Sequence, residues 1–145
     1  MMLNSERIGH EYPPLVYAVG REKIREYAAA VGDTEPLYTD LDAARAAGFA
    51  DLVAPPMFAV VYAGGGLEQG LFDPQLGIDF QRVVHGAQEF SWPGPAVVAG
   101  DEITSVFSVG EIRETAGLVF YEFGSRSVNQ AGATVCEGKW TIIVR

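Results

Sequence analysis

The side chains best suited to acid–base chemistry gather in one short segment, GDTEPLYTD, at residues 32–40. It holds Asp33, Glu35 and Tyr38. A carboxylate can hold and orient a water molecule but is a weak base alone, and tyrosine, with an unperturbed pKa near ~10, is a poor general base at neutral pH. Histidine is better suited, because imidazole titrates near neutral pH. The two histidines, His10 and His85, lie far from this segment in sequence.

Each of these residues also has a plain structural explanation. Aspartate is common in turns, so Asp33 fits the turn after a helix. Glu35 fits a solvated loop, and Tyr38 fits a tyrosine that packs its ring and hydrogen-bonds its hydroxyl. His85, in the segment VVHGAQEF, fits a hydrogen-bonded histidine near a strand end.

Two helices are predicted on either side of this segment. Gly32 stands where a glycine commonly follows a helix. A second, short helix starts after Thr39 or Asp40, either of which can cap it, and reaches Gly48. The first helix presents four apolar residues at the spacing i, i+3, i+4, i+7, namely Ile24, Tyr27, Ala28 and Val31.

A third helix is predicted to begin at Pro55 and Pro56, because proline suits the first turn. Its body, MFAVVYAGG, is apolar on all sides, which predicts a central helix buried on every side. The glycines at 64–66 indicate a close backbone approach at its end. The uncharged run 52–67 is shorter than the ~20 residues of a membrane helix and is interrupted by proline and glycine, so we expect no membrane span.

The second half of the chain predicts strands. Short turns, ETAG and NQAG, separate the last three, so these should be antiparallel neighbours. Helices followed by an antiparallel sheet indicate an α+β fold in which the sheet wraps around the central helix, with Trp140 on the core face. The expected strands are 15–19, 83–92, 102–112, 118–128 and 134–144.

Composition narrows the function classes. The chain has 145 residues with 10 Lys+Arg and 19 Asp+Glu, a net charge of −9, which argues against nucleic-acid or anionic-membrane partners. One cysteine, Cys136, excludes an internal disulfide framework and a Cys-based zinc site, and we expect no metal. The N-terminal residues lack the apolar core of a signal peptide, so a cytoplasmic location is expected.

Residues 30–58, AVGDTEPLYTDLDAARAAGFADLVAPPMF, resemble the MaoC-like hydratase/dehydratase family, which has the hot-dog fold. Enzymes of that family carry a loop of the form G-D-x-N-P-hydrophobic-H-x-D. Asp33 matches the catalytic aspartate, Glu35 stands at the usual asparagine, and Tyr38 replaces the catalytic histidine. The segments YAVGREKIREYA and VVHGAQEFSWPGPAVVAGDEI extend the resemblance over nearly the whole chain, which implies one hot-dog domain over residues 1–145.

The tyrosine and the sequence APP resemble the "dehydratase N-terminal domain" branch. Its members serve as the first half of a double hot dog, or as the substrate-binding subunit of (3R)-hydroxyacyl-thioester dehydratase heterodimers whose partner supplies the histidine. The resemblance implies an acyl-CoA or acyl-carrier-protein thioester as substrate, no cofactor, and a homodimer or a heterodimer with a catalytic hot-dog subunit. The catalytic candidates are Asp33, Tyr38 and His85, and the substrate-binding candidates are Pro36, Pro55, Pro56, Met57 and Phe58.

Two alternatives stay open. The first is a self-sufficient homodimeric (R)-hydratase that uses Asp33 with His85 or Tyr38, because residues of different protomers meet at the active site of hot-dog dimers. The second is an acyl-CoA thioesterase, since some hot-dog proteins hydrolyse thioesters with a single carboxylate near the central helix. The G-D-x-x-P loop favours hydratase chemistry over hydrolysis.

Overall fold

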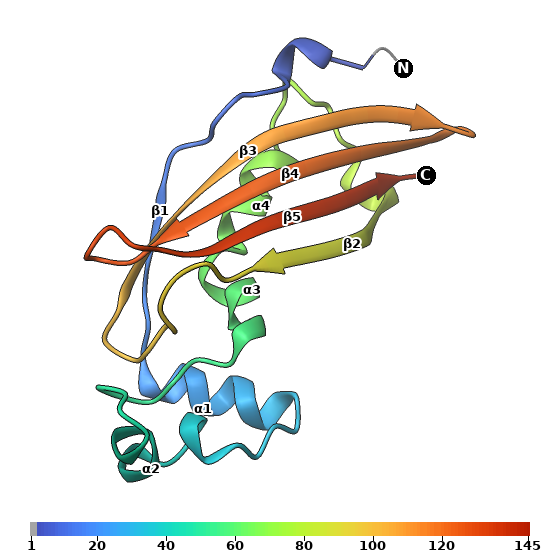
Figure 1. Ribbon diagram of the computed structural model, residues 1–145. Helices are drawn as coiled ribbons and strands as arrows, with labels where there is room; N and C mark the ends of the chain where they lie inside the picture. Colours follow the sequence, from blue (N-terminus) through green and yellow to red (C-terminus); the bar gives the residue numbers. More distant parts are fainter. Residues whose placement is uncertain (1–2) are drawn as a thin grey trace.

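The computed structural model describes residues 3–145 and has the predicted α+β architecture (Figure 1). Five antiparallel strands form one sheet in the order β1-β3-β4-β5-β2. Among these residues, no helix is long and apolar enough to cross a membrane. The strands are β1 (Leu15–Ala18), β2 (Val83–Ser91), β3 (Glu102–Thr115), β4 (Leu118–Val128) and β5 (Thr134–Val144), and the helices are α1 (Arg21–Ala30), α2 (Leu41–Ala46), α3 (Ala59–Tyr62) and α4 (Gly65–Leu71).

The predicted meander of the last three strands is confirmed. Strand β3 pairs with β4 down to Thr115 and Leu118, so only Ala116 and Gly117 form the turn. Both have positive φ, 52° and 78°, which a two-residue hairpin turn matching the twist of its strands requires. Strands β4 and β5 have the predicted bounds, and β3 runs three residues further than predicted because the tight turn lets pairing continue.

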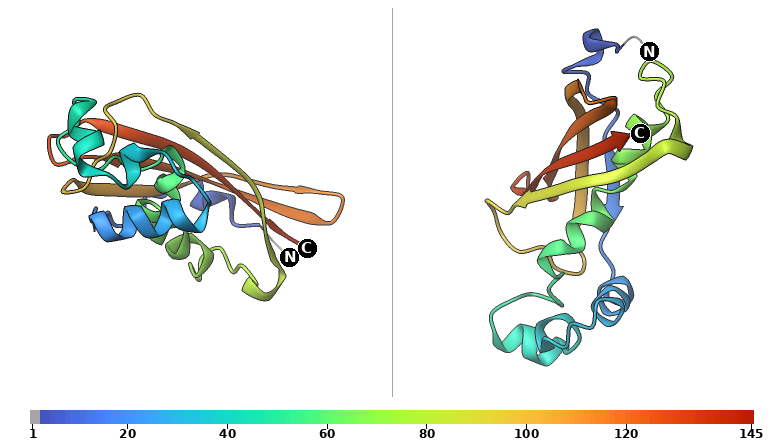
Figure 2. Two further views of the ribbon diagram at one scale, coloured as in Figure 1. Left: turned by 90° about the horizontal axis from the view of Figure 1, so that it is seen from below. Right: turned by 90° about the vertical axis from the view of Figure 1, so that its right-hand side faces the viewer.

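The core lies between the sheet and the central helix formed by α3 and α4 (Figure 2). Every second residue faces this helix and is buried along β4 and along β3 as far as Val109, as strand geometry requires. Beyond Val109, β3 has no buried residue. Trp140 on β5 is 3% exposed, which confirms its prediction as a core residue. The buried residues contributed by β3 and β4 include Ile103, Phe107, Val109, Val119, Tyr121 and Phe123.

Glycines let the central helix touch the sheet. A Cβ atom at Gly66 would run into the ring of Phe107, and one at Gly70 would run into the ring of Phe123. The helix backbone therefore lies directly on two fully buried aromatic rings, which confirms the predicted close approach of the glycine run.

The prediction of a central helix buried on every side is wrong in part. Phe58, Ala59 and Tyr62 are buried, but Met57 is 45% exposed and Val61 is only half-buried. The sheet of one chain covers only one side of this helix, so the other side stays partly accessible.

Helices α1 and α2 lie together beyond one end of the sheet (Figure 1). Helix α1 ends at Ala30, and Gly32 follows with φ 71°, as predicted. Val31, predicted on the apolar face, is 57% exposed because it already lies outside the helical turn. Asp40, rather than Thr39, caps α2 by accepting hydrogen bonds from the N–H groups of residues 42 and 43.

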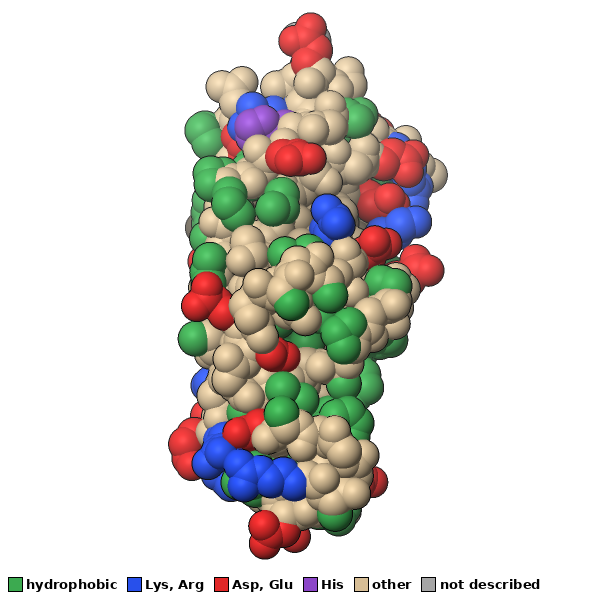
Figure 3. Space-filling model, turned by 60° about the vertical axis from the view of Figure 1, so that its left-hand side comes forward, with side chains coloured by type: hydrophobic (Ala, Val, Ile, Leu, Met, Phe, Trp, Pro, Cys, Tyr) green, Lys and Arg blue, Asp and Glu red, His purple; other side chains and the backbone are tan. Residues whose placement is uncertain are grey.

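Both signs of charge gather at this end of the molecule (Figure 3). Arg21, at the start of α1, donates two hydrogen bonds to Asp51, of 2.9 and 2.8 Å. These hydrogen bonds lower the pKa of Asp51 to about 2. The pair fastens α1 to the segment that leads into the central helix.

The N-terminal arm is tied to the end of α4 by a buried carboxylate. Asp73, 6% exposed, accepts hydrogen bonds from the Tyr12 hydroxyl at 2.7 Å and from Arg7 Nε at 2.8 Å. Burial by itself would raise the pKa of Asp73, but these two bonds and one from the Gln75 N–H outweigh it, so that the pKa lies below its usual value.

Candidate active site

A cavity of about 370 Å³ opens beside the start of the central helix. One wall is the loop after α1 together with the segment that enters the helix. The opposite wall is the proline-rich loop between β2 and β3, and Tyr62 and Val135 complete the cavity. The lining consists of residues 37–38, 53–56, Tyr62, Trp92, 94–97 and Val135.

Hydrogen bonds hold the two walls at a set distance. The Ala54 N–H donates to the Val97 carbonyl at 2.8 Å, and the Ala99 N–H donates to the Leu52 carbonyl at 2.9 Å. At the mouth, Trp92 Nε1 donates to the carbonyl of Pro56 at 3.1 Å. Segments about forty residues apart in sequence are thereby joined around one apolar space.

The loop of residues 32–40 brings Tyr38 to this cavity. Asp33 accepts a hydrogen bond from the Glu35 N–H at 3.1 Å, which bends the chain into a turn. A single 3-10 turn, Pro36–Tyr38, follows, and the Leu37 carbonyl accepts the Val53 N–H at 2.9 Å. This anchor places Leu37 and Tyr38 in the cavity wall, while Asp33 stays exposed outside the lining.

Tyr38 is a hydrogen-bond donor in this environment. Burial raises the pKa of its hydroxyl, and the negative charges of Asp33 and Glu35 raise it further. The hydroxyl therefore stays protonated at neutral pH and cannot act as a general base there. It can instead donate a hydrogen bond to a ligand oxygen in the cavity.

His85 lies elsewhere on the sheet. It is exposed on edge strand β2, at a register shift between His85 and Ala87. Its Nε2 lies 3.2 Å from the Ala87 carbonyl and 3.1 Å from Gln88 Oε1, and its ring stacks on Trp140. Six residues of extended strand, 86–91, separate it from Trp92 at the cavity mouth, a distance of roughly 20 Å. One chain by itself does not bring His85 to the cavity.

The predicted substrate-binding residues divide between the cavity and the rest of the fold. Pro55 and Pro56 line the cavity. Pro36 and Met57 are exposed outside its lining, and Phe58 is fully buried in the core. Trp92, residues 94–97 and Val135 were not predicted to bind substrate, whereas Tyr62 belongs to the apolar run 57–62, for which acyl-channel lining was the second interpretation after core. For Trp92 and residues 94–97, the only sequence signal was the turn SWPGP, which indicates a rigid loop without indicating its neighbour.

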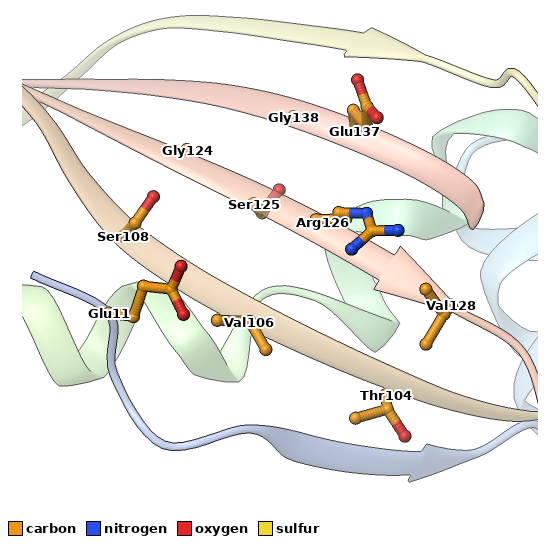
Figure 4. A pocket seen from close by; sticks show the side chains of 10 residues that line it. All are labelled: Glu11, Thr104, Val106, Ser108, Gly124, Ser125, Arg126, Val128, Glu137 and Gly138. Carbon is orange, nitrogen blue, oxygen red and sulfur yellow. The ribbon is translucent and has the colours of Figure 1, made fainter. Parts of the chain in front are cut away.

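A second hollow lies on the sheet face away from the helices (Figure 4). It measures about 450 Å³, and Arg126 extends over it between the edges marked by Glu11 and Glu137. Arg126 donates a hydrogen bond to Thr134 Oγ1 at 3.1 Å, and Ser125 Oγ accepts one from Trp140 Nε1. This hollow is lined by a mixture of charged, hydroxyl and small side chains, whereas the smaller cavity is mainly apolar and contains Tyr38 of the loop at 32–40. The smaller cavity is therefore the candidate site.

Comparison with known proteins identifies the family and the fold of this chain. A family model described as "FAS1-like, dehydratase domain region" matches residues 6–138. The chain belongs to this family. It is thus a MaoC-like hot-dog protein of the hydratase/dehydratase type, with the fold that the loop at 32–40 implied.

Sequence relatives extend over the full chain. A UPF0336 protein from Streptomyces griseus is 49% identical over 148 aligned positions, which cover 100% of this chain and 97% of the relative. Another, from Saccharopolyspora erythraea, is 44% identical over 146 positions and covers 100% of this chain and 93% of the relative.

Solved structures share the fold over nearly the whole chain. A MaoC-like dehydratase superposes with a TM-score of 0.84 at 29% identity over 95% of this chain, although the chain spans only 42% of that protein. The HadBC (3R-hydroxyacyl-ACP dehydratase) complex from Mycobacterium tuberculosis contains a chain with a TM-score of 0.82 at 26% identity, covering 97% of this chain and 99% of that one.

Proposed function

We propose that this MaoC-like protein is the acyl-thioester-binding subunit of an (R)-specific enoyl-thioester hydratase/3-hydroxyacyl-thioester dehydratase. The observation that carries the proposal is Tyr38. It occupies the position of the family's catalytic histidine, lines an apolar cavity, and is kept protonated by burial and by neighbouring carboxylates. The subunit holds the substrate, and a histidine-bearing partner supplies the base.

The chemistry assigns different tasks to the two subunits. Hydration adds the oxygen of water to Cβ of the enoyl thioester and a proton to Cα, while negative charge builds up on the thioester oxygen. The cavity of this chain holds the acyl group, and the Tyr38 hydroxyl donates a hydrogen bond to an oxygen of the substrate. The partner's histidine takes the proton from water and returns one to Cα.

Two observations support assembly with a second hot-dog subunit. HadBC is a dehydratase complex of two subunits, and one of its chains is similar to this chain over its whole length. Strand β2 is an edge of the sheet, so its outer backbone groups are free to pair with another chain. We propose a heterodimer with a catalytic hot-dog subunit encoded in the same genome, in the cytoplasm.

The test follows the enoyl absorbance of a short and a medium enoyl-CoA together with the release of free thiol. The purified chain alone should bind acyl-CoA but neither decrease the enoyl absorbance nor release free thiol. After the histidine-bearing subunit is added, the enoyl absorbance should decrease while no free thiol is released. Tyr38→Phe should weaken the activity of the complex, and Tyr38→His should give the isolated chain measurable activity.

Other outcomes would contradict the proposal. Full hydratase activity of the chain alone, abolished by His85→Ala, would indicate a self-sufficient homodimer. Thiol release by the chain alone would indicate a thioesterase. Complex activity unchanged in both Asp33→Asn and Tyr38→Phe would mean that the loop of residues 32–40 serves only as scaffold.

A further inference from the structure

The cavity becomes steadily more buried from its mouth to its floor. At the mouth, Trp92 is 44% exposed, and the neighbouring prolines are also exposed. Val97, also in the lining, is 7% exposed. Tyr62 and Val135, at 4% and 1%, are more deeply buried, and we take them as the floor against which a chain-like ligand that enters past Trp92 ends.

Behind Tyr62 the protein is closed. The Tyr62 ring is buried and packs beside the fully buried Phe58, with the two ring centres 6.3 Å apart. Further along, Gly66 and Gly70 set the helix backbone directly on the rings of Phe107 and Phe123. An acyl chain has no passage between helix and sheet beyond this point.

We propose that Tyr62 is the specificity-determining residue that ends the acyl site and limits it to short and medium chains. This inference rests on the proposed function, because it needs an acyl thioester in this cavity. Tyr62 is suited to the role because its side chain lines the cavity and packs on its far side against the core residue Phe58.

The size of the cavity agrees with such a limit. A cavity of about 370 Å³ lies at the small end of the range of ~300–1,000 Å³ that is typical of small-molecule sites. The thioester and the first atoms of its carrier occupy part of that space near the mouth. The floor is therefore reached before a long fatty-acyl chain is fully buried.

The test compares binding of butyryl-, octanoyl- and dodecanoyl-CoA by calorimetry, using the full chain. Each methylene that becomes buried tightens binding roughly fourfold. In the wild type, affinity should rise from butyryl to octanoyl and gain nothing from octanoyl to dodecanoyl. In Tyr62→Ala, the dodecanoyl-to-octanoyl affinity ratio should rise about tenfold or more, because the removed ring opens the floor.

Three further variants separate chain-length selection from general damage to the core. Tyr62→Phe keeps the ring and should keep the wild-type limit on acyl-chain length. Tyr62→Leu fills less of the space, so its limit should lie between those of the wild type and Tyr62→Ala. Tyr27→Ala removes a ring that packs on the other side of Phe58 and lies outside the cavity lining. It should leave the length limit unchanged.

The outcomes distinguish the two proposals. If Tyr62→Ala and Tyr62→Leu bind acyl-CoA with the wild-type length profile, Tyr62 does not limit the chain, although acyl binding itself stands. If the wild type binds no acyl-CoA of any length, alone or in the reconstituted complex, the proposed function fails as well. If only the reconstituted complex binds acyl-CoA, the chain-length dependence of the wild type and the variants is measured instead as kcat/KM with enoyl-CoAs of the same lengths.

Discussion

Replacing Gly66 by alanine tests how closely the central helix approaches the sheet. The new Cβ would lie 2.7 Å from Cγ and 2.8 Å from Cε2 of the Phe107 ring, distances that real Cβ contacts essentially never show. Phe107 is fully buried, and its ring centre lies 5.1 Å from that of Trp140, so it has little room to move. Strain of this kind costs ~1–3 kcal/mol.

The neighbouring Gly65 provides a matched control. A Cβ at Gly65 would meet only Leu15 Cδ1, the end of a flexible side chain, at 3.3 Å. Both substitutions gain helix propensity, worth up to ~1 kcal/mol. Gly65→Ala should therefore be neutral or slightly stabilising. Gly66→Ala should lower the free energy of unfolding by up to ~2 kcal/mol after the propensity gain is subtracted, which makes it ~1–3 kcal/mol less stable than Gly65→Ala.

The assays are thermal unfolding and urea unfolding, both followed by tryptophan fluorescence, since Trp140 lies in the same core. The two variants should separate by several degrees in Tm, at ~2–4 °C per kcal/mol for a chain of this size, with unchanged m-values. Phe107→Leu should lose less stability in the Gly66→Ala background than alone, because the smaller side chain relieves the clash. Equal stability of Gly65→Ala and Gly66→Ala would refute the close approach.

Three further predictions concern hydrogen bonds that join distant segments. Tyr12→Phe leaves the buried Asp73 short of one donor and should lower the free energy of unfolding by ~1–3 kcal/mol in urea titrations; no measurable loss would contradict this role. In the folded protein the pKa of Asp51 is lowered to about 2. The ionised carboxylate therefore stabilises the fold fully above its ordinary pKa near ~4, and this stabilisation is lost as pH falls towards 2. The difference in free energy of unfolding between wild type and Arg21→Ala should shrink over that range. A difference that stays constant from pH 6 to pH 2 would disprove this linkage. Trp92→Phe removes the hydrogen bond across the cavity mouth and should weaken acyl-CoA binding a few-fold with little change in Tm, whereas unchanged affinity would mean that the mouth holds its shape without it.

Local patterns in the sequence determined most of the secondary structure. The bounds of β4 and β5 follow from alternation and turn residues, and capping chemistry narrows the start of α2 to Thr39 or Asp40, because these signals act over a few neighbouring residues. The family could also be predicted from the loop at 32–40, because its motif is contiguous in sequence. The family that the loop resembles is the one to which the chain belongs. The exposure of Val31 and Met57 was not readable, because burial depends on what packs against a helix from elsewhere in the chain.

The candidate site was decided by tertiary structure. Trp92, Val97 and Val135 bear no mark of function in the sequence, and they line the cavity only because the loop after β2 hydrogen-bonds to the segment entering the central helix. The distance of His85 from that cavity was likewise set by its position along β2. The sequence by itself determined which local elements form and which loop holds Tyr38, since those depend on near-neighbour forces. Only the packing of distant segments decided where the cavity lies and where Tyr62 ends it, because that depends on contacts between residues tens of positions apart.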